Sequence, residues 1–118
     1  LVMLDIKHID DEQHKILTGQ TNRNILDMAR YLDEIGKPMW IRHVLVPERS
    51  DKDEYLTRLD AFILSLHNVQ KVEVLPYHTL GAYKWKELGY EYPLEGIDPP
   101  TQERIKNANQ LLHTGARV

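Results

Sequence analysis

The stretch PMWIRHVLVP (residues 38–47) is rich in tryptophan, isoleucine and valine and has a proline at each end, which is typical of a β-strand. Outward from it, the spacing of apolar residues predicts an amphipathic helix on each side, over 21–36 and 53–66. Further strands are predicted beyond these helices, over 1–6 and 69–78. The order strand, helix, strand, helix, strand predicts an α/β fold with parallel strands joined by right-handed crossovers.

Capping residues and breakers give the predicted boundaries. Thr21 is placed to cap the first long helix, and Ser50, with an aspartate three residues later, the second. A short polar helix is predicted over 10–17 and a C-terminal helix over 101–115. Before the C-terminal helix, residues 80–100 combine aromatic residues with glycine and proline, which favours a long ordered loop.

The composition bounds the size and class of the protein. Its 118 residues, 42% of them hydrophobic, fit a single unit over 1–118. The net charge is -3 and both signs are mixed along the chain, so no nucleic-acid partner is expected. No apolar run approaches the roughly 20 residues that cross a bilayer, so we expect no membrane association and a cytoplasmic protein. The absence of cysteine excludes disulfides, thiolate zinc sites and a cysteine-ligated iron–sulfur cluster within these residues.

Polar side chains are expected to gather where the predicted strands end. Side chains alternate across a strand, so Asp5 and Lys7 share one face and emerge together after the first strand. Arg42 lies on one face of the second strand, and His78 follows the third. Ligands of parallel α/β sheets bind outside the carboxyl ends of the strands, so these four side chains could converge on one small ligand. A carboxylate suits sugar hydroxyls or a cation, and lysine and arginine suit a carboxylate.

Structural roles are open for the same residues. Asp5 and Lys7 could be solvated loop residues, because strand ends commonly carry polar side chains. Arg42 could be held in an ion pair with a nearby carboxylate. His43, on the opposite face, is expected to pack against a helix. The remaining histidines lack metal-site spacing and are expected on the surface or in packing: His8, His14, His67 and His113.

Four segments, taken in order, carry a resemblance to a known family: VMLDIKH (2–8), WIRHVLVP (40–47), VEVLPYHTLGAYKW (72–85) and the proline pair before the last helix. Together they closely resemble the C-terminal half of the pyruvate formate-lyase activating enzymes, which are radical S-adenosylmethionine (SAM) enzymes. The resemblance covers essentially the whole chain. It implies the C-terminal half of a partial parallel (β/α)6 barrel, made of three β/α units, an aromatic loop and a C-terminal helix.

The resemblance also implies a chemistry. In the family a 4Fe-4S cluster reduces SAM, with an electron donor such as flavodoxin. The resulting 5′-deoxyadenosyl radical removes a hydrogen atom from a backbone glycine of pyruvate formate-lyase, an enzyme of anaerobic glucose metabolism. By this resemblance the parent protein is a formate C-acetyltransferase activating enzyme, a radical SAM oxidoreductase.

Residue roles are implied at the positions that match the family. The residues implied to bind SAM are Asp5, Lys7, Val44 and His78. Among them, Asp5 would approach the ribose, Lys7 the methionyl carboxylate and Val44 the adenine. Arg42 would belong to the cavity for SAM and the substrate peptide. A monovalent cation is implied at Asp5 and the backbone carbonyl of Met3, and no catalytic residue is implied in this segment.

One departure from the family is large. The CxxxCxxC loop that holds the cluster is absent, as is the glycine-rich segment that binds the methionyl amino group. We therefore interpret the chain, which also lacks an initiating methionine, as the C-terminal part of a longer enzyme and expect it to be inactive alone. An alternative function is a non-catalytic α/β module that binds a small ligand or a partner protein. A metal-dependent hydrolase using Asp5 and His78 lacks enough ligands to be favoured.

Half of a barrel is expected to expose an unpaired strand edge and an apolar inner face, and both favour association with a second copy. We predict that the isolated chain self-associates. Analytical ultracentrifugation over a range of concentrations would measure this, and a single monomeric species at all of them would contradict it.

Overall fold

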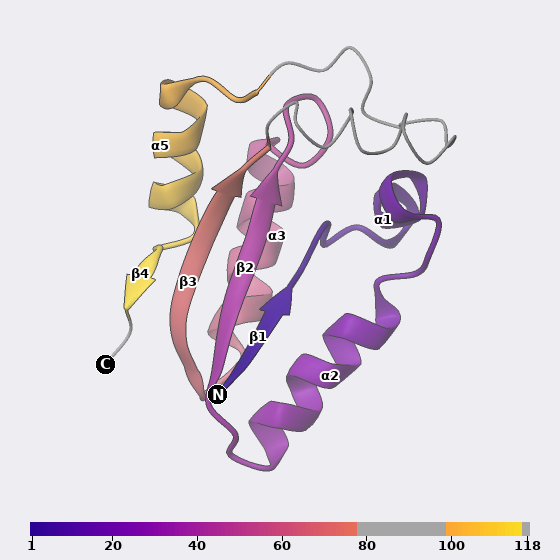
Figure 1. Cartoon of the computed structure of the whole chain (residues 1–118), viewed down its shortest axis with the longest axis vertical. Helices are drawn as coiled ribbons and strands as arrows, with labels where there is room; N and C mark the ends of the chain where they lie inside the picture. The colour runs from indigo at the N-terminus through magenta and orange to yellow at the C-terminus, as the bar shows by residue number, and fades with distance from the viewer. Residues whose placement is uncertain (78–98, 117–118) are drawn as a thin grey trace, which may run out of the picture.

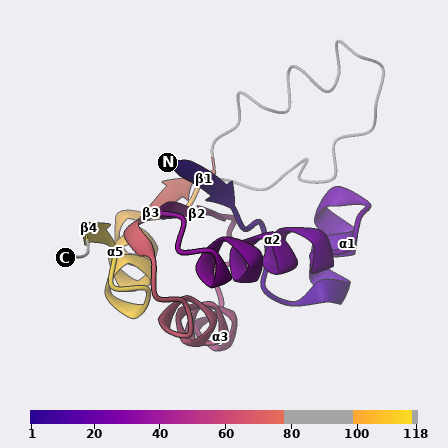
Figure 2. The same ribbon diagram turned by 90° about the horizontal axis from the view of Figure 1, so that it is seen from below.

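The computed structural model describes residues 1–77 and 99–116, in which four strands form one sheet in the order β1-β2-β3-β4 (Figure 1). The strands are β1 (Val2–Asp5), β2 (Met39–Leu45), β3 (Val69–Pro76) and β4 (Gly115–Ala116). The helices are α1 (Asp11–Thr18), α2 (Arg23–Glu34), α3 (Asp53–Leu64) and α5 (Gln102–Leu111). Helices α2, α3 and α5 cover one face of the sheet, and no described helix lies on the other (Figure 2).

Strands β1, β2 and β3 are parallel, as their alternation with helices predicts. The two long helices predicted over 21–36 and 53–66 are present as α2 and α3, and the third predicted strand is present as β3. Their ends lie within a few residues of the predicted ones, whereas the C-terminal helix differs more. The α/β class is therefore confirmed. The aromatic loop and His78 lie outside the described residues.

The C-terminal segment departs from the predicted helix over 101–115. Helix α5 ends at Leu111, and Gly115–Ala116 then pairs antiparallel with β3. The turn between them uses positive φ angles at His113 (50°) and Gly115 (111°), and glycine reaches the second value without strain. This fourth strand, which the sequence pattern does not predict, makes the sheet mixed instead of purely parallel.

Neither predicted capping residue lies at the N-cap position. Asn22, not Thr21, precedes α2, and the hydroxyl of Thr21 donates to Asp11 Oδ1 at 2.6 Å while it accepts the N–H of Arg23, the first residue of the helix, at 3.2 Å. Asp11 also accepts the backbone N–H of Asn22 at 2.9 Å, and these bonds lower the pKa of its carboxyl to about 2. Lys52 precedes α3, and Ser50 lies buried in the loop before it. Thr21 thus satisfies one N–H at the start of α2, whereas Ser50 fixes a loop.

Alternation along β2 separates the two faces of the sheet. Ile41 and Leu45 face the helices and have no exposed surface, whereas Trp40 and Val44 on the opposite face are half-buried. Ile41 stands opposite Leu4 of β1 in the register, and both belong to the core cluster between the sheet and the helices. Burying one such side chain contributes about 1.5–3 kcal/mol, so this layer holds the fold together.

The face without a helix carries both charged and apolar side chains, so the expected apolar inner face is present only in part among the described residues. Asp5, Arg42, Lys71 and Glu73 all lie on it, at alternate positions of the three parallel strands, interleaved with Met3, Trp40, Val44 and Leu75. The outer edge of β1 pairs with no described strand. The self-association expected from this edge and face stays a prediction. None of the described helices is long and apolar enough to span a membrane.

Ile41→Ala should lower the free energy of unfolding by about 2–5 kcal/mol, because it leaves a cavity in the fully buried layer. Val44→Ala, three residues along the same strand and on the half-buried face, is the matched control and should cost clearly less. Denaturant unfolding followed by circular dichroism measures both. Equal losses for the two variants would contradict the assignment of the core to the helix side.

Candidate functional site

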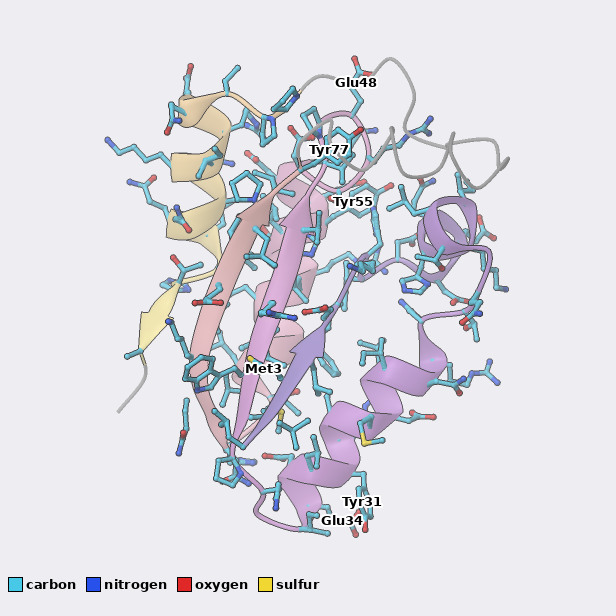
Figure 3. All side chains as sticks on the ribbon, in the orientation of Figure 1. Met3, Tyr31, Glu34, Glu48, Tyr55 and Tyr77 are labelled. Atoms are coloured by element: carbon cyan, nitrogen blue, oxygen red, sulfur yellow. The ribbon has the colours of Figure 1, made fainter. Side chains whose placement is uncertain are left out.

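The candidate site lies on the charged face of the sheet, toward the carboxyl ends of the parallel strands. In Figure 3 the side chain of Met3 lies on this face, and Glu48, Tyr55 and Tyr77 lie beyond the strand ends. The register sets side chains in rows across the strands: Met3, Trp40 and Lys71 form one row, and Asp5, Arg42 and Glu73 form the next. Each row runs at right angles to the strands, so residues far apart in sequence become neighbours.

Asp5 and Arg42 form a two-pronged ion pair in the second row. Arg42 Nε donates to Asp5 Oδ1 at 2.6 Å, and Arg42 Nη2 donates to Asp5 Oδ2 at 3.1 Å. Hydrogen bonding to this carboxylate, followed by the attraction of its charge, raises the pKa of Arg42 above its ordinary value. The ion pair that the sequence left open for Arg42 is therefore present. A carboxylate has about four lone-pair positions, so Asp5 keeps acceptor capacity for a ligand.

Two charges of β3 extend the site, and the sequence analysis missed both. Glu73 stands opposite Arg42, and its Oε1 forms an ion pair with Lys71 Nζ at 2.8 Å. Lys71 Nζ also lies 4.8 Å from the centre of the Trp40 ring, which is a cation–π distance. The available signal was the pattern in VQKVEVLP, where two charges two residues apart share one face of an apolar strand, as Asp5 and Lys7 do.

Lys7 and Val44 lie at the end of the site nearest the loops. Lys7 follows β1, is exposed, and forms no ion pair with any residue that the structure describes. Val44 stands opposite Leu75, and both are half-buried on the charged face. The structure thus brings Asp5, Arg42 and Val44 onto one surface with Lys7 at its end, whereas His78 lies outside the described residues.

Two buried histidines fix the loop between β2 and α3. His43 Nδ1 donates to the carbonyl of Ile6 at 2.7 Å, and its Nε2 lies 3.4 Å from the carbonyl of Ser50. His8 Nε2 donates to the carbonyl of Arg49 at 2.9 Å, while its Nδ1 accepts the N–H of Asp10 at 3.0 Å. Burial lowers the pKa of both imidazoles, which favours their neutral forms. As expected from the sequence, both serve packing.

The hydroxyl of Ser50 closes the same loop. Its Oγ accepts the N–H of Val46 and donates to the carbonyl of Val44, each at 2.9 Å. Glu48, at the tip, has a positive φ of 66°. The edge of Tyr55 packs on His8, with ring centres 4.5 Å apart. The loop beside Val44 is therefore held by buried groups on both sides.

The donor set fits SAM and does not fit an iron–sulfur cluster. Asp5 has acceptor capacity for hydroxyls, Lys7 offers a cation without an ion pair in the described part, and Val44 with Leu75 offers an apolar surface. The chain contains no cysteine, so its residues cannot ligate a cluster in the usual way. Among the described residues, no group of three or more histidines and carboxylates is placed to hold a metal ion.

Curated relatives match nearly the whole chain, although no family model does. The pyruvate formate-lyase-activating enzyme of Streptococcus mutans is 59% identical over 114 residues, which are 97% of this chain and 43% of that protein. The enzymes of the same name from Listeria monocytogenes and Staphylococcus epidermidis are 52% and 50% identical, and the chain covers 47% of each. The chain therefore spans a little under half the length of these relatives.

Two solved structures share the fold. A domain of pyruvate-formate lyase-activating enzyme from Bacteroides vulgatus superposes with a TM-score of 0.76 at 21% identity, covering 95% of this chain and 61% of that one. A radical SAM methyltransferase from Sphaerobacter thermophilus superposes with a TM-score of 0.66 at 18% identity, covering 94% of this chain and 30% of that one. The mixed α/β fold of the chain is thus shared with both structures.

Stability should fall as the pH drops from about 6.5 toward 5, because burial lowers the pKa of His8 and His43, so the unfolded chain, with an ordinary histidine pKa of about 6.5, takes up protons before the folded chain does. The stability that a lowered histidine pKa contributes is fully present above the pKa of the unfolded chain and is lost as the pH falls below it. Carboxylates titrate lower, at about 4, so this window isolates the histidines. Denaturant unfolding at pH 5 to 8 measures the slope, which should be shallower in His43→Gln. A slope of the opposite sign would contradict the assignment.

Proposed function

We propose that this chain, a homologue of the pyruvate formate-lyase-activating enzymes, forms the C-terminal half of a radical SAM activating enzyme and supplies part of its site for SAM and the protein substrate. The observation that carries the proposal is 48–59% identity to enzymes of that name over at least 97% of the chain. The row of charges at the strand ends supports it, because it offers the groups that such a ligand needs.

Within this proposal, bound SAM supplies, on reduction, the radical that abstracts a hydrogen atom from a glycine of pyruvate formate-lyase. Asp5 accepts hydrogen bonds from the ribose hydroxyls with the acceptor positions that Arg42 leaves unused. Arg42 fixes the orientation of that carboxylate through its two hydrogen bonds. Lys7 binds the methionyl carboxylate. No step at an iron–sulfur cluster is assigned to this chain, since it has no cysteine.

The apolar part of the site has a separate task in the proposal. Val44 and Leu75 form a half-buried wall against which a purine ring packs, and this wall excludes water from the reacting atoms. The buried histidines hold the adjoining loop, so the wall keeps its position. His78 contributes from beyond the described residues, and a monovalent cation at the carbonyl of Met3 and at Asp5 completes the proposed site.

The proposal extends to partners and context. The protein substrate would be pyruvate formate-lyase, and an electron donor such as flavodoxin would serve the parent enzyme in the cytoplasm. The name of the relatives supports the substrate, because they are called activating enzymes of pyruvate formate-lyase.

A chimaera tests the residue roles. In it this chain replaces the matching 114 residues of the Streptococcus mutans relative, and the remainder of that enzyme is kept. Lys7→Ala should weaken SAM binding about 10-fold or more, because it removes a charged partner of the ligand's carboxylate. Asp5→Asn and His78→Ala should also lower the yield of 5′-deoxyadenosine. Equilibrium dialysis with SAM and product analysis measure the two effects.

Matched controls are available on the covered side of the molecule. Lys106→Ala on α5 and Asp27→Asn on α2 remove charges of the same kinds from exposed helix positions. Both should leave SAM binding unchanged. Unaltered cleavage in all three site variants would refute the site, and a chimaera that binds no SAM would favour a non-catalytic module.

A further inference from the structure

Among the residues that the structure describes, the outer edge of β3 is only partly paired. On its inner side β3 pairs with β2 along its whole length, but on its outer side β4 reaches only Lys71 and Val72. From there to Pro76 the outer side of β3 has no neighbouring strand in the described part of the chain. An edge of this kind is a template for another extended segment.

The backbone of Val74 faces this open side. The N–H of Tyr77 donates to the carbonyl of Leu45 at 3.1 Å, toward β2. Backbone groups alternate in direction along a strand, so those of Glu73 also point to β2 while the N–H and C=O of Val74 point outward. Neither group of Val74 has a hydrogen-bond partner among the described residues. Pro76 has no N–H, which ends the ladder two residues later.

A pocket of about 280 Å³ lies beside the open edge. Its lining includes Val74 and Leu75 from β3 and Asn109 and Thr114 from the α5 end of the chain. The hydroxyl of Thr114 donates to Asn109 Oδ1 at 2.9 Å, and this bond fixes the orientation of the side-chain amide. The Nδ2 group of Asn109 keeps its donors, since no described residue accepts from it. A peptide carbonyl fits this position.

We propose that this edge, at Val74 and the adjoining pocket, binds an extended segment of the substrate polypeptide as an added strand. An unpaired N–H and C=O of one residue require a complementary pair, which another backbone supplies. The pairing of Gly115–Ala116 on the same edge is an example within the molecule. The inference rests on the proposed function for the identity of that polypeptide, pyruvate formate-lyase.

The dimensions of the edge favour a short peptide over a second copy of the chain. Beyond β4 the open edge offers the two groups of Val74 before Pro76 interrupts it, and the charges of Lys71 and Glu73 lie beside it. Charged side chains and proline on an edge disfavour long strand pairing between copies. A segment that adds one pair of backbone bonds satisfies both groups of Val74, and one further bond engages a donor of Asn109.

The test uses the chimaera described above and a synthetic peptide that spans the radical glycine of pyruvate formate-lyase. Amide exchange followed by NMR should show the Val74 N–H slowed about 10-fold or more on peptide binding. N-methylation of the peptide should weaken binding only at the position that donates to Val74, and methylation of the adjacent residue should not. Neither measurement requires a substitution in the protein.

A pair of variants on one helix completes the experiment. Asn109→Ala should weaken peptide binding by about 2-fold to 10-fold, through the loss of one hydrogen bond. Asn107→Ala is the control, because its Nδ2 donates to Asp53 Oδ1 at 2.9 Å, away from the pocket. A peptide that binds without protecting Val74, or that does not bind, overturns this inference. SAM cleavage without peptide is measured in parallel, so a failure of the proposed function is recognised separately.

Discussion

The parallel ladder between β1 and β2 places Asp5 opposite Arg42, and the arrangement of the charged face follows from this register. Side chains alternate strictly along β1. A slip of this strand by one residue would therefore bring Leu4 and Ile6 to the charged face and turn Asp5 and Lys7 toward α2 and α3. The ion pair and the core beneath it thus favour the same register. Beyond the end of β1 the N–H of Ile6 donates to the carbonyl of Arg42 at 2.9 Å, which continues the ladder toward Lys7.

The two faces of the sheet obey different constraints. The helix side excludes water and is filled by aliphatic side chains, with His43 as a buried polar exception bonded to the carbonyl of Ile6. The other side presents alternating charges, in which the carboxylates of Asp5 and Glu73 flank the guanidinium of Arg42. Such a surface is locally close to neutral yet strongly polar, which suits a ligand that itself carries both charged and apolar parts.

Periodicity and breakers in the sequence predicted the three parallel strands and the helices between them. They did not predict β4, because two residues are too short to show a period, and they misplaced both N-caps, because the hydroxyl of Thr21 also bonds to Asp11 and that of Ser50 bonds within its own loop. At the site, alternation within one strand placed Asp5 and Lys7 together. The same alternation in VQKVEVLP indicates that Lys71 and Glu73 share a face, but the position of Glu73 opposite Arg42 depends on pairing between strands, which one sequence does not specify.

The loop between β2 and α3 is held by its backbone carbonyls and by two of its own polar side chains. His8 and His43 contact the carbonyls of Arg49 and Ser50, the hydroxyl of Ser50 bonds to Val44 and Val46, and Asp51 accepts the N–H of Glu48. A loop built this way can exchange its outward side chains over evolutionary time while its course in space is inherited unchanged. The surface beside Val44 could therefore change its chemistry by single substitutions, without insertions or a remodelled scaffold.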